Sequence, residues 1–191
     1  MANVSRVNGF RAVKFNGAAS TNLRVTTYAI LAADATAVFV GDAVKLAGTA
    51  DANGVRAVTK AAVGDPIVGI VCEYVPDYAN LNVTYRVGST LRYVQVWDDP
   101  NEIFAVQVSG AFALADVGLN ANFVDAGGST VTGMSGETLD GSTKATTATL
   151  TFKTLDFFQE QGNEPGNANA KVLVRINNHQ LAAGTGTLGV A

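Results

Sequence analysis

The chain contains 191 residues, of which 48% are hydrophobic and 15% are charged, with a formal net charge of −3 and one cysteine. A single cysteine excludes an internal disulfide and a thiolate metal cluster within the chain, and the acidic balance argues against nucleic acid as the direct partner. We therefore expect one core that is held by packing alone, under a surface that is unusually apolar or covered by partners.

The apolar segments are too short to cross a membrane. The run at 67–72 is interrupted by a glycine, and no segment approaches the roughly 20 apolar residues of a spanning helix. The first residues include Arg6, but no apolar stretch follows, so we expect no secretory signal. The sequence thus predicts synthesis in the cytoplasm and no membrane partner.

Residues 1–24 are predicted to form an extended N-terminal arm. Asn-Gly pairs at 8–9 and 16–17 are turn signals, and amphipathic periodicity is weak between them. Residues 1–33 contain four bases and no acid, whereas the remainder contains nine bases and all 16 acids. A basic arm suits an acidic neighbour, although a solvated tail or packing on the chain's own body are the alternatives. The candidate contacts with a capsid or another subunit are Arg6, Phe10, Arg11, Lys14 and Phe15.

Residues 25–180 are predicted to form a β-rich body, because β-branched and aromatic residues dominate the runs between turn signals. A strand at 24–30 is followed by segments 38–46 and 55–59, which we expect to form a hairpin. The segment 67–74 is apolar on both faces, which is typical of a central, buried strand.

The second half of the body continues this pattern. The clearest predicted hairpin joins 91–97 to 102–108 through a turn that contains Pro100. One short helical turn is expected near 111–117, and the Gly-, Ser- and Thr-rich residues 125–145 are expected to form a long loop.

The chain is predicted to close with two long strands, 145–158 and 170–179, and a small-residue tail, 181–191, that is flexible or ordered by a partner. The predicted fold class is all-β: a single antiparallel β-barrel or sandwich with the N-terminal arm and at most one short helix.

Few residues offer chemistry. Cys72 and His179 are the one thiol and the one imidazole, and a reactive pair requires that they meet, whereas a small buried residue and a strand end explain them more simply. Asp98, Asp99 and Glu102 resemble a cation or acid–base cluster, but their neighbours favour a turn. We therefore expect no catalytic residues, no metal and no cofactor.

Aromatic side chains near one strand permit another function. Trp97, Tyr93 and Tyr85 are amphipathic rings of the kind that bind sugars, although core or subunit contacts explain them more simply. A receptor- or carbohydrate-binding β module on a phage surface is therefore the alternative function. A hydrolase with paired carboxylates and a tail component of a virion are weaker alternatives.

Several segments together resemble the capsid cement, or decoration, proteins of tailed bacteriophages. They are Asn-Gly-Phe-Arg-Ala-Val-Lys at 8–14, Val-Gly-Asp-Ala-Val at 40–44, Asp-Val-Gly-Leu-Asn-Ala-Asn at 116–122, Thr-Lys-Ala-Thr-Thr-Ala-Thr-Leu at 143–150 and Asn-Ala-Lys-Val-Leu-Val-Arg-Ile-Asn at 169–177. The resemblance lies in the order and spacing of these segments and extends over most of the chain, but none of them is a catalytic or ligand-binding motif.

The resemblance implies a non-enzymatic virion protein on the capsid exterior. Such a protein binds the major capsid protein, commonly as a homotrimer, and stabilises the shell by bridging neighbouring subunits. Residues 1–24 are expected to extend across a neighbouring subunit. Deletion of residues 2–20 is therefore expected to leave a folded body that no longer binds heads.

Overall fold

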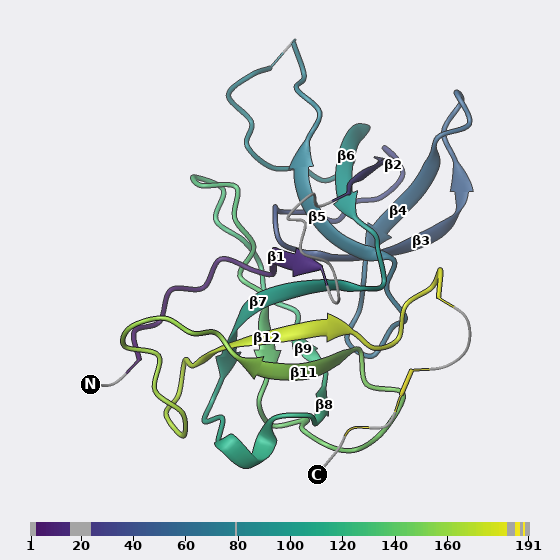
Figure 1. Cartoon of the computed structure of the whole chain (residues 1–191). Helices are drawn as coiled ribbons and strands as arrows, with labels where there is room; N and C mark the ends of the chain where they lie inside the picture. Colours follow the sequence, from purple (N-terminus) through teal and green to yellow (C-terminus); the bar gives the residue numbers. More distant parts are fainter. Residues whose placement is uncertain (1–2, 16–23, 79, 183–185, 188, 190–191) are drawn as a thin grey trace.

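The structure, a computed structural model, describes residues 3–15, 24–78, 80–182, 186–187 and 189. The described chain is all-β, as predicted, and its one helical element is a single 3-10 turn, η1, at Leu114–Asp116 (Figure 1). The strands are β1 (Arg11–Phe15), β2 (Thr26–Ile30), β3 (Ala43–Ala50), β4 (Arg56–Lys60), β5 (Gly69–Tyr74), β6 (Arg92–Trp97), β7 (Glu102–Ser109), β8 (Asn120–Ala121), β9 (Phe123–Val124), β10 (Thr138–Asp140), β11 (Phe152–Phe157) and β12 (Lys171–Ile176).

Strands β2 to β6 close into a small barrel in the order β2-β4-β3-β5-β6. All pairings are antiparallel except the single parallel contact that joins β2 to β4. The interior is filled by side chains that suit a pleated, buried surface. These are Tyr28, Ile30, Val38, Val44, Val58, Val68, Val71, Val94 and Val96.

The remaining strands form a seven-stranded sheet in the order β8-β11-β12-β7-β10-β9, with β1 paired to β7 beside this path. Figure 1 shows β7, β12 and β11 side by side beneath the barrel strands. A second hydrophobic cluster unites this sheet with the outside of the barrel, because Ile70 and Trp97 of the barrel pack with Phe104 and Val174 of the sheet. The single expected core is therefore two clusters, because a closed barrel must fill its own interior.

The predicted hairpin at 91–108 is wrong. Strand β6 pairs with β2 and β5 in the barrel, whereas β7 pairs with β12, β1 and β10 in the other sheet. The turn between them carries the chain from one sheet to the other. Trp97 and Phe104 lie on either side of this turn, and their rings meet edge to face in the shared core at 6.4 Å. The segments on either side of the turn therefore contact each other through side-chain packing between the two sheets, and not through hydrogen-bonded pairing of β6 with β7.

Other elements follow the prediction more closely. The hairpin of β3 and β4 is confirmed, β5 lies between β3 and β6, and η1 falls within the expected 111–117. Two strands are shorter at their start than predicted. Residues 145–151 lie outside β11, and before β3 the chain makes only isolated bridges, from Val38 to Arg86 and from Val40 to Met134.

The N-terminal residues are integrated into the body. Gly9 has a φ of 71°, and a Cβ there would lie 2.6 Å from that of Ser135, so the chain bends at a site where only glycine fits. Phe10 is fully buried and stacks on Phe152, with ring centroids 4.3 Å apart. Strand β1 then pairs with β7. Deletion of residues 2–20 would remove a strand and a core ring, so a folded body is no longer expected from it.

The described part of the C-terminal tail also contacts its own chain. The backbone N–H of Thr187 donates to Asn177 Oδ1 at 2.8 Å, and that of Gly189 donates to the carbonyl of Thr146 at 3.0 Å. Among residues 181–191, positions 183–185, 188 and 190–191 lie outside the described residues. Partner contacts of the tail stay a prediction.

Candidate interaction surface

The N-terminal segment is attached to the end of β7 by side-chain amides. The backbone N–H of Arg6 donates to Gln107 Oε1 at 3.0 Å, and Gln107 Nε2 donates to the carbonyl oxygens of Val4 and Asn169. Asn3 forms a reciprocal pair with the backbone of Glu164, at 3.0 and 2.8 Å. Because Gln107 is almost fully buried, these bonds satisfy its amide as they hold the segment in place.

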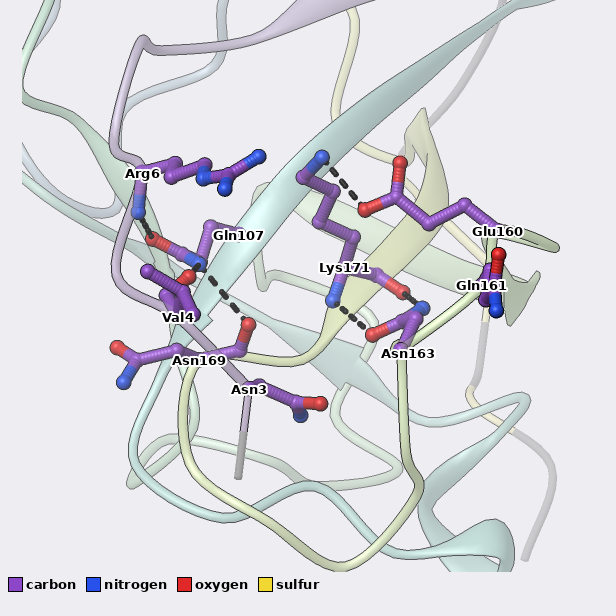
Figure 2. Close-up of a pocket in the computed structure, with 10 residues that line it drawn as sticks. Asn3, Val4, Arg6, Gln107, Glu160, Gln161, Asn163, Asn169 and Lys171 are labelled. Atoms are coloured by element: carbon purple, nitrogen blue, oxygen red, sulfur yellow. Dashed lines mark hydrogen bonds and ion pairs between the residues drawn. The ribbon is translucent and has the colours of Figure 1, made fainter. Parts of the chain in front are cut away.

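A cavity of about 320 Å³ opens between this segment and the loop that precedes β12 (Figure 2). Asn163 fixes the loop by bonding the backbone N–H and carbonyl of Lys171, and Lys171 Nζ pairs with Glu160 at 2.7 Å. Polar side chains dominate the wall. The lining residues are Asn3, Val4, Arg6, Gln107, Glu160, Gln161, Gly162, Asn163, Asn169 and Lys171.

The structure separates the five predicted contact residues. Arg6 lines this cavity, and Arg11 lines an adjoining one of about 180 Å³ that shares Gln107 and Lys171 with it. Lys14 is exposed on β1. Phe10 is corrected from a contact residue to a core residue, because its ring is wholly enclosed by its own chain. The side chain of Phe15 lies outside what the structure describes.

A buried charged cluster at the junction of barrel and sheet was not predicted from the sequence. Lys60 Nζ lies 2.7 Å from Asp125, 3.5 Å from Glu137 and 3.7 Å from Asp42. Asp42 and Glu137 are fully buried. Glu137 Oε2 accepts the N–H of Ala43 at 2.9 Å, and Asp42 Oδ2 accepts that of Phe39 at 2.8 Å. The first of these bonds links the residue before β10 to the start of β3, and the second is local to the residues before β3.

Electrostatics in this cluster follow from burial. Desolvation raises the pKa of Glu137 well above its usual range, and the nearby Asp42 raises it further. The pKa of Asp42 is also raised by burial, while the carboxylates around Lys60 raise the pKa of its ammonium. The two innermost carboxyls have no exposed surface on which a substrate could be bound. Through Lys60 on β4, the cluster links the barrel to Asp125 after β9 and to Glu137 before β10. Its members are far apart in sequence, so no local motif marks them.

The cysteine and the histidine do not form a reactive pair. Burial raises the pKa of the Cys72 thiol to about 11, which keeps it protonated, and burial lowers the pKa of His179. His179 Nδ1 accepts the backbone N–H of Leu181 at 3.0 Å, and no hydrogen bond joins the imidazole to Cys72. Within the described residues, no group of three or more His, Cys, Asp or Glu side chains is placed to hold a metal ion.

The acidic residues at 98–102 form the turn that the sequence favoured. Asp98 accepts hydrogen bonds from the hydroxyls of Thr26 and Tyr28 at 3.0 and 2.8 Å, which anchors the turn to β2. Asp99 accepts from the backbone of Asn101 at 2.8 Å. Glu102 is fully buried and neither of its carboxyl oxygens has a hydrogen-bond partner. Burial, with help from Asp99 and Asp98, raises its pKa to about 8.

Replacement of Glu102 by glutamine is expected to stabilise the fold at alkaline pH. A carboxyl whose pKa is raised from 4.5 to about 8 favours the folded state while it is protonated, and this contribution is lost as pH rises through 8. The free energy of unfolding of Glu102→Gln should therefore exceed that of the wild type by about 2–4 kcal/mol near pH 8, and the two should converge only near pH 4, below the unfolded-state pKa of 4.5. Urea unfolding at both pH values measures this gap, and a gap that is independent of pH would contradict it.

The three aromatic residues considered for sugar binding do not share an exposed platform. Trp97 is 9% exposed and packs against Phe104. Tyr93 donates its hydroxyl to Asp51 at 2.5 Å, and the Tyr85 ring stacks on Phe39 at 4.9 Å. Each ring thus has a different neighbour, and the stacking face on which that interpretation depended is not formed.

Searches with the chain against protein-family models, curated proteins and solved structures found no match. Across the described residues, no helix has the length and apolar character needed to cross a membrane.

Proposed function

We propose that the protein is a non-enzymatic structural component of a virion, which binds the outer surface of a tailed-phage capsid and stabilises it by bridging major capsid protein subunits. The observation that carries the proposal is a set of exposed apolar side chains on loops that are tied firmly to the barrel. Tyr78, Leu81 and Val131 are 90%, 70% and 85% exposed. Large apolar groups presented in this way are typical of surfaces that meet protein partners.

The attachments of these loops support the proposal, because a contact residue on an ordered support loses little entropy on binding. Arg86 is fully buried, and its guanidinium donates to the carbonyl oxygens of Leu31, Asp34, Thr36 and Thr90. The loop that contains Val131 is joined to the barrel side of the molecule by the backbone N–H of Val40, which donates to the carbonyl of Gly133 at 2.9 Å.

Bridging explains how such a protein would stabilise a shell. Packaged DNA strains the joints between capsid subunits, so contact area that spans a joint raises the free energy of rupture. A specific attachment needs about 1,600 Å² of buried surface. Where one copy touches two subunits, the second contact becomes intramolecular, so weak individual contacts suffice. A homotrimer would multiply these contacts further.

The test uses heads that were assembled without this protein. Addition of the purified chain is expected to raise the temperature at which the heads release their DNA, as followed with a DNA-binding dye. Tyr78→Ser and Leu81→Ser together should abolish most of this effect without unfolding the protein, since both side chains are exposed. Heads that rupture at the same temperature with and without saturating wild-type protein would contradict the proposal.

Solution mass distinguishes the proposal from its alternative. A stable species near three times 19.7 kDa in sedimentation supports the trimeric bridging protein. Binding of glycans by the isolated protein, together with no binding to heads, would instead favour a receptor- or carbohydrate-binding module.

A further inference from the structure

The outer face of the seven-stranded sheet is basic although the protein as a whole is acidic. Strand β12 alternates, with Val172, Val174 and Ile176 in the core, so Lys171 and Arg175 lie on the opposite face. Strand register extends this face to β11 and β1, because Arg175 is opposite Lys153 and Ile103, and Ile103 is opposite Lys14. We call Arg6, Lys14, Lys153, Lys171 and Arg175 the basic face.

Counter-charges are few on this surface. Glu160 pairs with Lys171, and exposed Asp156 on β11 accepts the backbone N–H of Phe157. Lys153 and Arg175 are directly opposite each other on neighbouring strands, a placement of like charges that costs stability. Among the described residues, Arg6, Lys14 and Arg175 have no carboxylate within ion-pair distance. Within the described part of the chain, Arg6, Lys14 and Arg175 thus carry charges that no nearby carboxylate balances.

The cavity beside this face adds groups that suit a peptide. In Figure 2 the Arg6 side chain extends toward the Lys171–Glu160 pair, and both Arg6 and Lys171 line the cavity. The side-chain amides of Gln161 and Asn169 also line it and make no hydrogen bond among the described residues. An amide offers both donors and an acceptor, as a peptide backbone requires, while a guanidinium binds a carboxylate in two-point fashion.

We propose that the basic face and its cavity bind an extended acidic segment of a partner protein. Charge complementarity selects the acid, and the amide-lined cavity of about 320 Å³ selects a peptide over a phosphate chain. Single-stranded nucleic acid would need stacking rings, and no aromatic residue lines this cavity. The proposal rests on the proposed function in one respect, namely that the acidic segment belongs to a capsid subunit.

Fluorescence anisotropy with a labelled peptide of alternating glutamate and valine tests the site. The wild type is expected to bind it, more weakly as salt is raised. The double variant Arg6→Glu with Arg175→Glu should bind at least about tenfold more weakly, since it replaces two attractive charges by repulsive ones. Arg56→Glu, a single charge reversal on the exposed start of β4 in the barrel, is the control and should bind as the wild type does, whereas each of the single variants Arg6→Glu and Arg175→Glu should not.

Three results would overturn the site: equal binding by the double variant, equal binding of a lysine–valine peptide, or tighter binding of a DNA oligonucleotide. Arg6→Gln and Arg175→Gln replace the double variant if circular dichroism shows that charge reversal unfolds it. Binding to heads separates this proposal from the proposed function. A double variant that occupies heads fully overturns the acidic-segment site alone, whereas wild type that binds the acidic peptide but not heads overturns the capsid function alone.

Discussion

Replacing Phe10 with alanine is expected to lower the free energy of unfolding by about 3–5 kcal/mol. The ring is fully buried, stacks on Phe152 at 4.3 Å and belongs to the cluster that unites the sheet with the barrel. Its removal leaves a cavity that the close-packed neighbours cannot fill. The backbone here is held as well, because the N–H of Phe10 donates to the carbonyl of Gly41 at 3.1 Å.

Urea unfolding followed by Trp97 fluorescence measures this loss. Phe10→Leu retains most of the buried volume and should cost less than half as much. Val4→Ala, at a side chain that is 63% exposed in the same segment, is the control and should leave stability within about 0.5 kcal/mol of the wild type. A Phe10→Ala loss no larger than that of Val4→Ala would show that the N-terminal segment is not part of the folded body.

The second large effect is expected at Lys60, where methionine should cost about 3–5 kcal/mol at neutral pH. The ammonium lies between two fully buried carboxyl groups, Asp42 and Glu137, and methionine keeps its length but removes its charge. Without that charge, neither of these two buried carboxyls has a cation within ion-pair distance among the described residues.

The pH dependence of this loss identifies its cause. Burial raises the folded-state pKa values of Asp42 and Glu137, so their neutral forms favour folding and this contribution declines as pH rises. The deficit of Lys60→Met should therefore shrink toward acidic pH, where both groups are neutral, and grow toward alkaline pH. Lys45→Met removes a partly exposed partner of Asp65 and should cost under about 1 kcal/mol. A Lys60→Met deficit that is constant with pH would exclude the electrostatic explanation.

The sequence predicted most of the strands because their residues carry local information. Alternation and β-branched residues located β2, β4, β6, β7 and β12, and the two-faced apolar run located β5, which lies between β3 and β6 in the barrel. The same local pattern could not reveal which strands pair. The turn at 98–101 is compatible with a hairpin, and its true path depends on the packing of Trp97 against Phe104.

The candidate site was predictable only in part. The charge asymmetry of the chain pointed to Arg6 and Lys14, which do lie on the basic face. Lys171 and Arg175 belong to a strand that is ordinary in sequence, and only its register beside β7 and β11 brings them to that surface. The sequence predicts Phe10 as a contact with a partner, because the residues that enclose its ring, such as Phe152, lie more than a hundred positions away and no local pattern identifies them.

Integration of the N-terminal segment changes how the capsid proposal must be examined. If a variant without residues 2–20 failed to bind heads, the cause could be unfolding as well as a lost capsid contact, because β1 and Phe10 are part of the folded body. Exposed positions such as Arg6 and Tyr78 permit changes that alter the surface alone.

The most direct test of the central claim is co-sedimentation of the purified protein with heads that were assembled without it. We expect the chain to enter the pellet with the heads and to saturate at a fixed number of copies for each capsid subunit. Folded protein that stays in the supernatant at every concentration would contradict a role on the capsid surface.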